Sequence, residues 1–152
     1  MIDIVPNWHP VFVHFTVALL PMAALLYAAA AAAPGGRWSV HLLSAARINL
    51  WLGVLLSLVT VVAGFIAMTH AVHTDAQLAV VQIHRRAALV TAVFWWVLAL
   101  WDVRSARKGR RPPLAFVLLA LAALAPLSGT GWLGAELVYR HGVGVQHDAN
   151  SP

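Results

Sequence analysis

Histidine is the residue type through which this chain could do chemistry, because the sequence holds eight histidines and no cysteine. Two of them, His9 and His14, stand at the entrance to an almost wholly apolar segment. An ionisable side chain at membrane depth is costly, so it marks a candidate functional site. Neutral imidazole ligates transition metals and haem iron. Without thiols, the histidines near the ends of apolar segments are the first candidates for a metal or cofactor site.

The composition places these histidines in an integral membrane protein. Hydrophobic residues make up 61% of the chain and charged residues only 10%, whereas soluble domains are about 25% charged. Ten Lys and Arg exceed five Asp and Glu, but the basic residues gather between apolar runs, which favours membrane topology over nucleic-acid binding. No basic region precedes the first apolar run, so we expect a retained helix there rather than a signal peptide.

Four apolar stretches reach the roughly 20 residues that a helix needs to cross a bilayer core. We expect one transmembrane domain over residues 1–152, an all-α, up-down four-helix bundle. Pro21 and Pro126 interrupt the first and fourth stretches, where each removes a backbone hydrogen bond. The expected helices cover approximately residues 10–33, 45–70, 76–103 and 114–140.

The basic residues predict the orientation of this bundle. Seven lie in or beside the first and third loops, and three lie on the opposite side. By the positive-inside rule the first and third loops are cytoplasmic, so both termini should lie on the external side. His41 then falls at the cytoplasmic end, while seven histidines fall at or beyond the external ends of helices: His9, His14, His70, His73, His84, His141 and His147.

These histidines are not equal candidates. His73 and His147 fit ordinary interfacial histidines that hydrogen-bond water or head groups. His14 is the hardest to explain in this way, because it lies about 6 Å further into the membrane than the start of its helix. Its sequence neighbours are apolar, so its partner must come from another helix or from a ligand.

Haem b fits this pattern better than a copper or zinc ion. A histidine-bound ion takes three or four imidazoles and a carboxylate nearby, and Glu136 is the one candidate for a buried acid near that end. Haem needs one or two axial histidines from facing helices, small residues beside the ring and basic groups for its propionates. Close helix packing and lipid head groups explain the same glycines and arginines equally well. The candidate haem contacts are His14, His84, His141 and His70 as ligands, His9 as a substitute ligand or propionate partner, Arg85 and Arg140 for propionates, and Gly64, Gly129, Gly131, Gly134, Phe65 and Trp132 around the ring.

Three stretches of the sequence resemble a known family. They are residues 9–15 (HPVFVHF), His84 at the opening of the third helix, and residues 131–145 (GWLGAELVYRHGVGV). Together they resemble the prokaryotic membrane family catalogued as domain of unknown function 2231, over nearly the whole chain. The resemblance implies that the family's histidine positions are His9, His14, His84 and His141 of this chain.

That resemblance also implies a place in electron transfer, because some relatives join this four-helix module to Rieske iron–sulfur or cytochrome c domains. This sequence departs from the family in having Thr16 where proline often follows His-Phe. It also carries no fused redox domain, so we expect a separate redox partner subunit or periplasmic carrier.

We therefore expect a multi-pass protein of the prokaryotic inner membrane that binds one or two haem b groups and links a periplasmic redox partner with the quinone pool. It would be an electron-transfer subunit rather than a stand-alone enzyme. His14 and His84, from diagonal helices, are the first axial pair, and His141 and His70 a possible second pair.

Several alternatives remain open on the sequence alone. One is a cofactor-free membrane anchor or assembly subunit, and another is a histidine-bound copper or zinc site at the external face. A quinone site near Trp132 and Glu136 is not distinguishable from ordinary apolar packing. The expected partners are the lipid bilayer, the redox partner and, in a homo-oligomer, a second copy of the chain.

Overall fold

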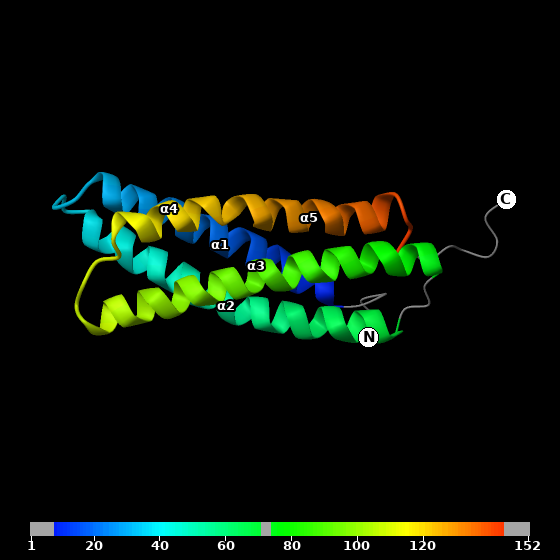
Figure 1. The fold of residues 1–152 in the computed structure, drawn as a ribbon. Helices are drawn as coiled ribbons and strands as arrows, with labels where there is room; N and C mark the ends of the chain where they lie inside the picture. Colours follow the sequence, from blue (N-terminus) through cyan, green and yellow to red (C-terminus); the bar gives the residue numbers. More distant parts are fainter. Residues whose placement is uncertain (1–7, 71–73, 145–152) are drawn as a thin grey trace.

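The computed structural model of the chain describes residues 8–70 and 74–144, and that part of the chain is built from α-helices alone. The helices are α1 (His9–Ala32), α2 (Ser39–His70), α3 (Asp75–Arg107), α4 (Leu114–Ala122) and α5 (Leu124–Tyr139). Four spans are long and apolar enough to cross a membrane, the fourth being α4 and α5 together (Figure 1). The expected all-α architecture with four apolar spans is therefore confirmed.

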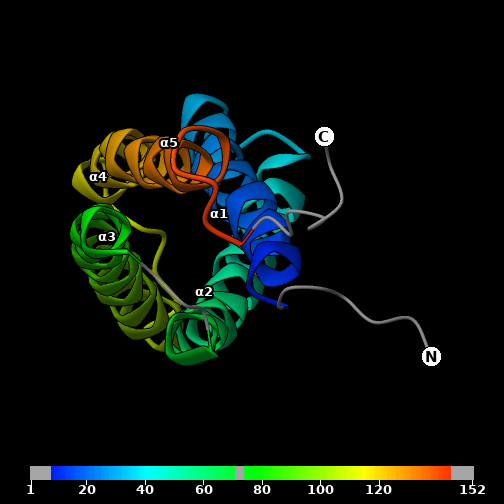
Figure 2. The same ribbon diagram turned by 90° about the vertical axis from the view of Figure 1, so that its right-hand side faces the viewer.

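Consecutive spans run antiparallel, and an end view shows them arranged in a ring (Figure 2). The α1 helix packs most closely against α2, because a Cβ at Gly53 would stand only 2.7 Å from Leu20 Cδ2. The α3 helix packs against α2 and α5, and α4 packs against α1. Among the described helices the backbone of α1 does not approach that of α3, and the backbone of α2 approaches neither α4 nor α5. The prediction that the first and third helices are diagonal is confirmed.

Caps explain where the helices begin. Pro10 lies in the first turn of α1, where its missing N–H is not needed. Thr74 caps α3 in a capping box in which its side chain accepts from the Gln77 N–H at 3.3 Å and its own N–H donates to Gln77 Oε1 at 2.9 Å. The α2 helix begins at Ser39 rather than near residue 45, and α3 continues to Arg107 rather than ending near residue 103.

Pro126 divides the fourth span in two. Proline has no N–H to donate to the carbonyl of Ala122, four residues earlier, and α4 ends at that residue. The next residue keeps a helical backbone, so α5 continues directly. The Pro126 carbonyl accepts hydrogen bonds from the hydroxyl groups of Thr91 at 3.3 Å and Thr130 at 2.8 Å. The break therefore supplies a polar link between α5 and α3.

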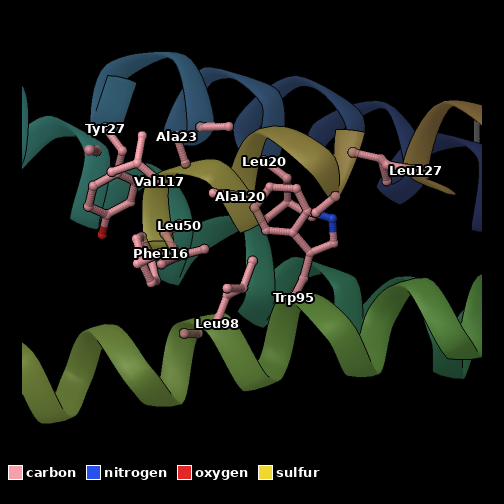
Figure 3. Close-up of a cluster of buried hydrophobic side chains, with 14 residues drawn as sticks. Leu20, Ala23, Tyr27, Leu50, Trp95, Leu98, Phe116, Val117, Ala120 and Leu127 are labelled. Carbon is pink, nitrogen blue, oxygen red and sulfur yellow. The ribbon is translucent and has the colours of Figure 1, made fainter. Parts of the chain in front are cut away.

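A buried apolar core fills the half of the bundle that leads to the basic loops (Figure 3). The rings of Tyr27 and Trp101 contact Phe116 edge-on, with centroids 4.9 and 5.7 Å away, a favoured aromatic geometry. All four spans contribute to this core, whose larger members are Leu20, Tyr27, Leu50, Trp95, Leu98, Phe116, Val117 and Leu127. This half of the bundle is therefore densely packed.

A buried ion pair joins α2 to α3 beside this core. Asp102 is completely buried, and its Oδ1 accepts a hydrogen bond from Arg47 Nε at 3.2 Å. Arg47 also donates to the backbone carbonyl of Arg110 at 3.0 Å, and the Tyr27 hydroxyl lies beside the carboxylate. The pair thus connects two helices with the loop that follows α3. Sequence reasoning did not single out Asp102, although a buried acid in a span is as unusual as a histidine.

We expect Asp102→Ala to destabilise the fold, because it leaves the largely buried Arg47 guanidinium without a counter-charge. Breaking such a pair costs about 3 kcal/mol, which corresponds to a fall of roughly 6 to 12 °C in the midpoint of thermal unfolding, measured in detergent. The double variant Arg47→Met/Asp102→Ala should lose less than the two single variants together. Arg104→Ala, at an exposed position, is the matched control, and an equal loss there would contradict the role of the pair.

Candidate functional site

The half of the bundle opposite the basic loops encloses a cavity of about 740 Å³. That volume lies within the range of about 300 to 1,000 Å³ typical of ligand and cofactor pockets. The lining is mostly apolar and comes from α1, α2, α3 and α5. Along α1 it reaches from His9 to Leu20, and along α3 from Val81 past His84 to Trp95. The bundle is therefore packed at one end and hollow at the other.

Eight of the residues predicted from the sequence line this cavity. Helices that are distant in sequence and diagonal in the bundle bring their histidines to the same space. The eight are His9 and His14 from α1, Gly64 and Phe65 from α2, His84 and Arg85 from α3, and Gly131 and Gly134 from α5.

His9 is seated against α2. Its Nδ1 lies 2.9 Å from the backbone carbonyl of Thr60, and because a carbonyl can only accept, Nδ1 must carry the proton. A Cβ at Gly64 would stand 3.0 Å from both Cε1 and Nδ1 of the ring. Glycine at this position therefore makes the space that the His9 ring occupies. In the neutral tautomer, Nε2 then carries the lone pair that can ligate a metal.

His84 is seated against α5 in a corresponding way. A Cβ at Gly134 would lie 3.3 Å from the Cε1 atom of its ring. The His84 Nδ1 atom is buried on this side and makes no hydrogen bond within the described part of the chain, although the Thr130 carbonyl lies beside the ring. The residue also lines the cavity.

His14 has a different setting from these two. Its side chain is exposed at the cavity wall, and its Nδ1 donates to the carbonyl of Pro10, one turn earlier in the same helix, at 2.6 Å. No second helix is needed to hold the ring. The expectation that another helix supplies its hydrogen-bond partner is therefore wrong.

Threonine pairs satisfy most of the remaining polar groups of the wall. The hydroxyl groups of Thr16 and Thr60 lie 3.0 Å apart and join α1 to α2. Those of Thr91 and Thr130 lie 3.0 Å apart and join α3 to α5. Sequence reasoning missed all four residues, because a single threonine in an apolar helix carries no distinctive signal. Since these hydroxyl groups bond to each other, the wall they line stays largely apolar.

The cavity is not closed off from the surface of the bundle. Val17 on α1, Phe65 on α2 and Gly131 and Val138 on α5 line the cavity and are also exposed. The α1 and α5 helices make few contacts with each other, because α1 packs chiefly on α2 and α4.

Other predicted site residues lie elsewhere. The side chain of His141, in the turn after α5, is not part of the cavity lining, and its carbonyl accepts from Gln77 Nε2 at 2.8 Å. Arg140 pairs with Glu136 at 2.6 Å on the outer surface, beside a shallow pocket that includes Trp132.

Some of the predicted site residues find no support in the described geometry or fall outside it. Gly129 faces open space, with no neighbouring atom within 4 Å of a Cβ built there. The side chain of His70, and His73 and His147 entirely, lie outside the described part of the chain. Phe65 lines the cavity, whereas Trp132 does not.

The arrangement of the histidines favours a ligand held by one or two imidazoles. Across residues 8–70 and 74–144, no group of three or more His, Cys, Asp or Glu side chains is close enough together to hold one metal ion. Protein zinc sites use three or four such ligands. The described residues therefore give no support to the alternative of a copper or zinc site.

Comparison with known proteins identifies the family. Residues 6–147 match the family described as "Predicted membrane protein (DUF2231)". The chain belongs to this family. The match spans every cavity-lining residue named above, and it agrees with a multi-pass membrane protein. No curated protein and no solved structure matches the chain, so the DUF2231 membership assigns a kind of protein and no activity.

We expect Gly64→Ala and Gly134→Ala to displace the rings of His9 and His84. The added Cβ would lie tighter against its neighbour than ordinary van der Waals contact at both positions, and more so at Gly64. Each variant should shift the NMR signals of the crowded imidazole and lower the midpoint of thermal unfolding, with the larger fall for Gly64→Ala. Gly129→Ala is the control, because it adds a methyl group in open space and improves helix propensity by up to about 1 kcal/mol. Unchanged imidazole signals in both Gly64→Ala and Gly134→Ala would contradict the contact of the two rings with these glycines.

Proposed function

We propose that this chain is a haem b protein of the prokaryotic inner membrane that transfers electrons between a periplasmic redox partner and the quinone pool. His84 and a histidine of α1 would hold the haem iron within the cavity. When bound, the haem supplies a one-electron change between ferric and ferrous iron. The observation that carries the proposal is the pair of imidazoles, from diagonal helices, that line one apolar cavity and rest on glycines.

The backbone carbonyls beside these rings support this role. A ligating histidine usually donates its other N–H to a carboxylate, a carbonyl or water, which fixes the tautomer and the orientation of the ring. The Thr60 carbonyl does this for His9 at 2.9 Å, and the Thr130 carbonyl lies in the corresponding place beside His84. In this tautomer Nε2 of each ring would be the atom that binds the iron.

The remaining wall suits a large, flat and mostly apolar group. Apolar side chains exclude water, and the paired threonine hydroxyl groups leave few polar atoms to solvate. Arg85 follows His84 directly and also lines the cavity, so its guanidinium would pair with a haem propionate. In the described structure that guanidinium is held by the Gln82 side chain.

The position of the cavity supports a partner on the periplasmic side. The basic loops lie at the other end of the bundle, and by the positive-inside rule that end is cytoplasmic. The cavity then lies in the external half of the membrane, within reach of a periplasmic partner. Its exposed lining residues, Val17, Gly131 and Val138, would give access to the lipid in which quinones dissolve.

We expect the purified protein, reconstituted with haem b, to show the absorption bands of a ferrous haem after reduction with dithionite. His84→Ala should weaken haem binding on the order of 100-fold, because it removes an iron ligand. His41→Ala, at the opposite end of the chain's spans, is the matched control and should bind haem like the wild type. A wild-type protein that binds no haem under these conditions would contradict the proposal and favour the cofactor-free anchor.

We expect the orientation to be measurable with single cysteines, because the chain has none of its own. Tyr139→Cys places a thiol at an 89% exposed position at the cavity end, and Lys108→Cys places one in the exposed basic loop. A membrane-impermeant maleimide added to spheroplasts should label the first variant and not the second. The reverse labelling would place the cavity in the cytoplasmic half and contradict the periplasmic partner.

A further inference from the structure

The wall of the cavity repeats itself. His9 and His84 are 75 positions apart. When 75 is added to the number of each α1 residue that lines the cavity, the result is in every case an α3 residue that lines it, and α3 has only Val81 in addition. Shifting every lining position of α2 by 70 residues, the separation of Gly64 and Gly134, reproduces the lining of α5 with only Tyr139 in addition. The hairpin of α1 and α2 therefore forms one half of the wall, and the pair α3 and α5 forms the other.

The contacts repeat as well as the positions. His9 rests on Gly64 beside the Thr60 carbonyl, and His84 rests on Gly134 beside the Thr130 carbonyl. Each of these glycines lies four residues after the threonine concerned. The two imidazole seats are thus built from the same parts in each half.

A second contact follows the same rule. Thr16 lies seven residues after His9, and Thr91 lies seven residues after His84. Each bonds to the threonine of the neighbouring helix in its own half, Thr16 to Thr60 and Thr91 to Thr130, with the oxygen atoms 3.0 Å apart in both pairs.

The separation of 75 positions also relates residues at the end of the bundle near the basic loops. Tyr27 and Asp102 are also 75 positions apart, and their side chains lie beside each other in the core. At the cavity end, His9 and His84 line the same cavity. Equivalent residues of two repeats approach each other where a two-fold axis passes between them. Parallel repeats related by an axis along the membrane normal occur in other membrane proteins.

We infer that the cavity is a pseudo-two-fold site formed by two related helical hairpins, and that its equivalent histidines, His9 and His84, are the axial pair of a single haem. The identity of the bound group rests on the proposed function; the pairing rests on the repeat. The iron of a haem has two equivalent axial positions on opposite faces, which matches equivalent imidazoles presented by diagonal helices.

His14 is excluded from the pair by the same comparison. Its counterpart on α3 is Leu89, so the second half of the wall offers no matching imidazole. His14 is also exposed and held by its own helix through the Pro10 carbonyl. The sequence analysis favoured His14 as the partner of His84, because His14 lies further into the membrane than the start of its helix. The repeat instead favours His9 as the partner of His84.

The test compares three matched variants of the full-length chain, His9→Met, His84→Met and His14→Met, each reconstituted with haem b. Methionine keeps much of the side-chain volume and can itself ligate iron, which raises the reduction potential. Absorption and electron paramagnetic resonance spectra report the axial ligands, and redox titration reports the midpoint potential. We expect His9→Met and His84→Met each to lose the bis-imidazole signature and to raise the potential by similar amounts, and His14→Met to match the wild type.

Two results would overturn the pairing. If His14→Met changes the ligation while His9→Met does not, the axial pair is His14 and His84, and the proposed function stands without this inference. If the wild type itself binds no haem, the proposed function fails and the pairing fails with it. Where a methionine variant does not fold, the alanine variant with added imidazole replaces it. Rescue of the bis-imidazole spectrum in His9→Ala and His84→Ala supports the pair, and failure of rescue in His9→Ala counts against it.

Discussion

An imidazole inside an apolar helical bundle needs a hydrogen-bond partner and a place for its ring, and much of this structure follows from that requirement. For His9 the partner is the Thr60 carbonyl, and the place is the space that Gly64 leaves on α2. His84 has the corresponding space at Gly134 on α5. Both rings are thus fixed by a neighbouring helix before any ligand binds. Preorganised ligands of this kind are what a metal or haem site requires.

One end of the bundle is tightly packed and stabilises the fold, and the other end holds the cavity. Near the basic loops, large side chains such as Phe116 and Trp95 fill the interior, and the Arg47–Asp102 pair joins α2 to α3. At the other end a cavity of about 740 Å³ remains, and Trp95 lines it where it meets the packed half. Tight packing in one half allows the other half to stay hollow, because the helices that surround the cavity are already held in place.

The sequence was sufficient for the architecture and for part of the site. Hydropathy and length revealed four spans, and the Thr74 cap was readable from residue type. The convergence of His9, His14 and His84 followed from their common position at one end of the spans. The rotation of each helix was not readable, since hydrophobic residues surround these helices on all sides. His141 was therefore grouped with the others, although its side chain is not in the cavity lining. The pairing of Arg140 with Glu136, four residues apart on one helix, was predictable from spacing alone.

The repeat escaped detection in the sequence because it is carried by only a few identical residues separated by unlike apolar ones. It becomes visible once the cavity selects which positions to compare, and it implies one site shared by two halves rather than two separate sites. The most direct test is therefore a titration of haem b into the purified, haem-free chain, with binding followed by absorbance. The account predicts saturation at one haem per polypeptide with a bis-imidazole spectrum. Saturation at two, or no binding at all, would contradict it.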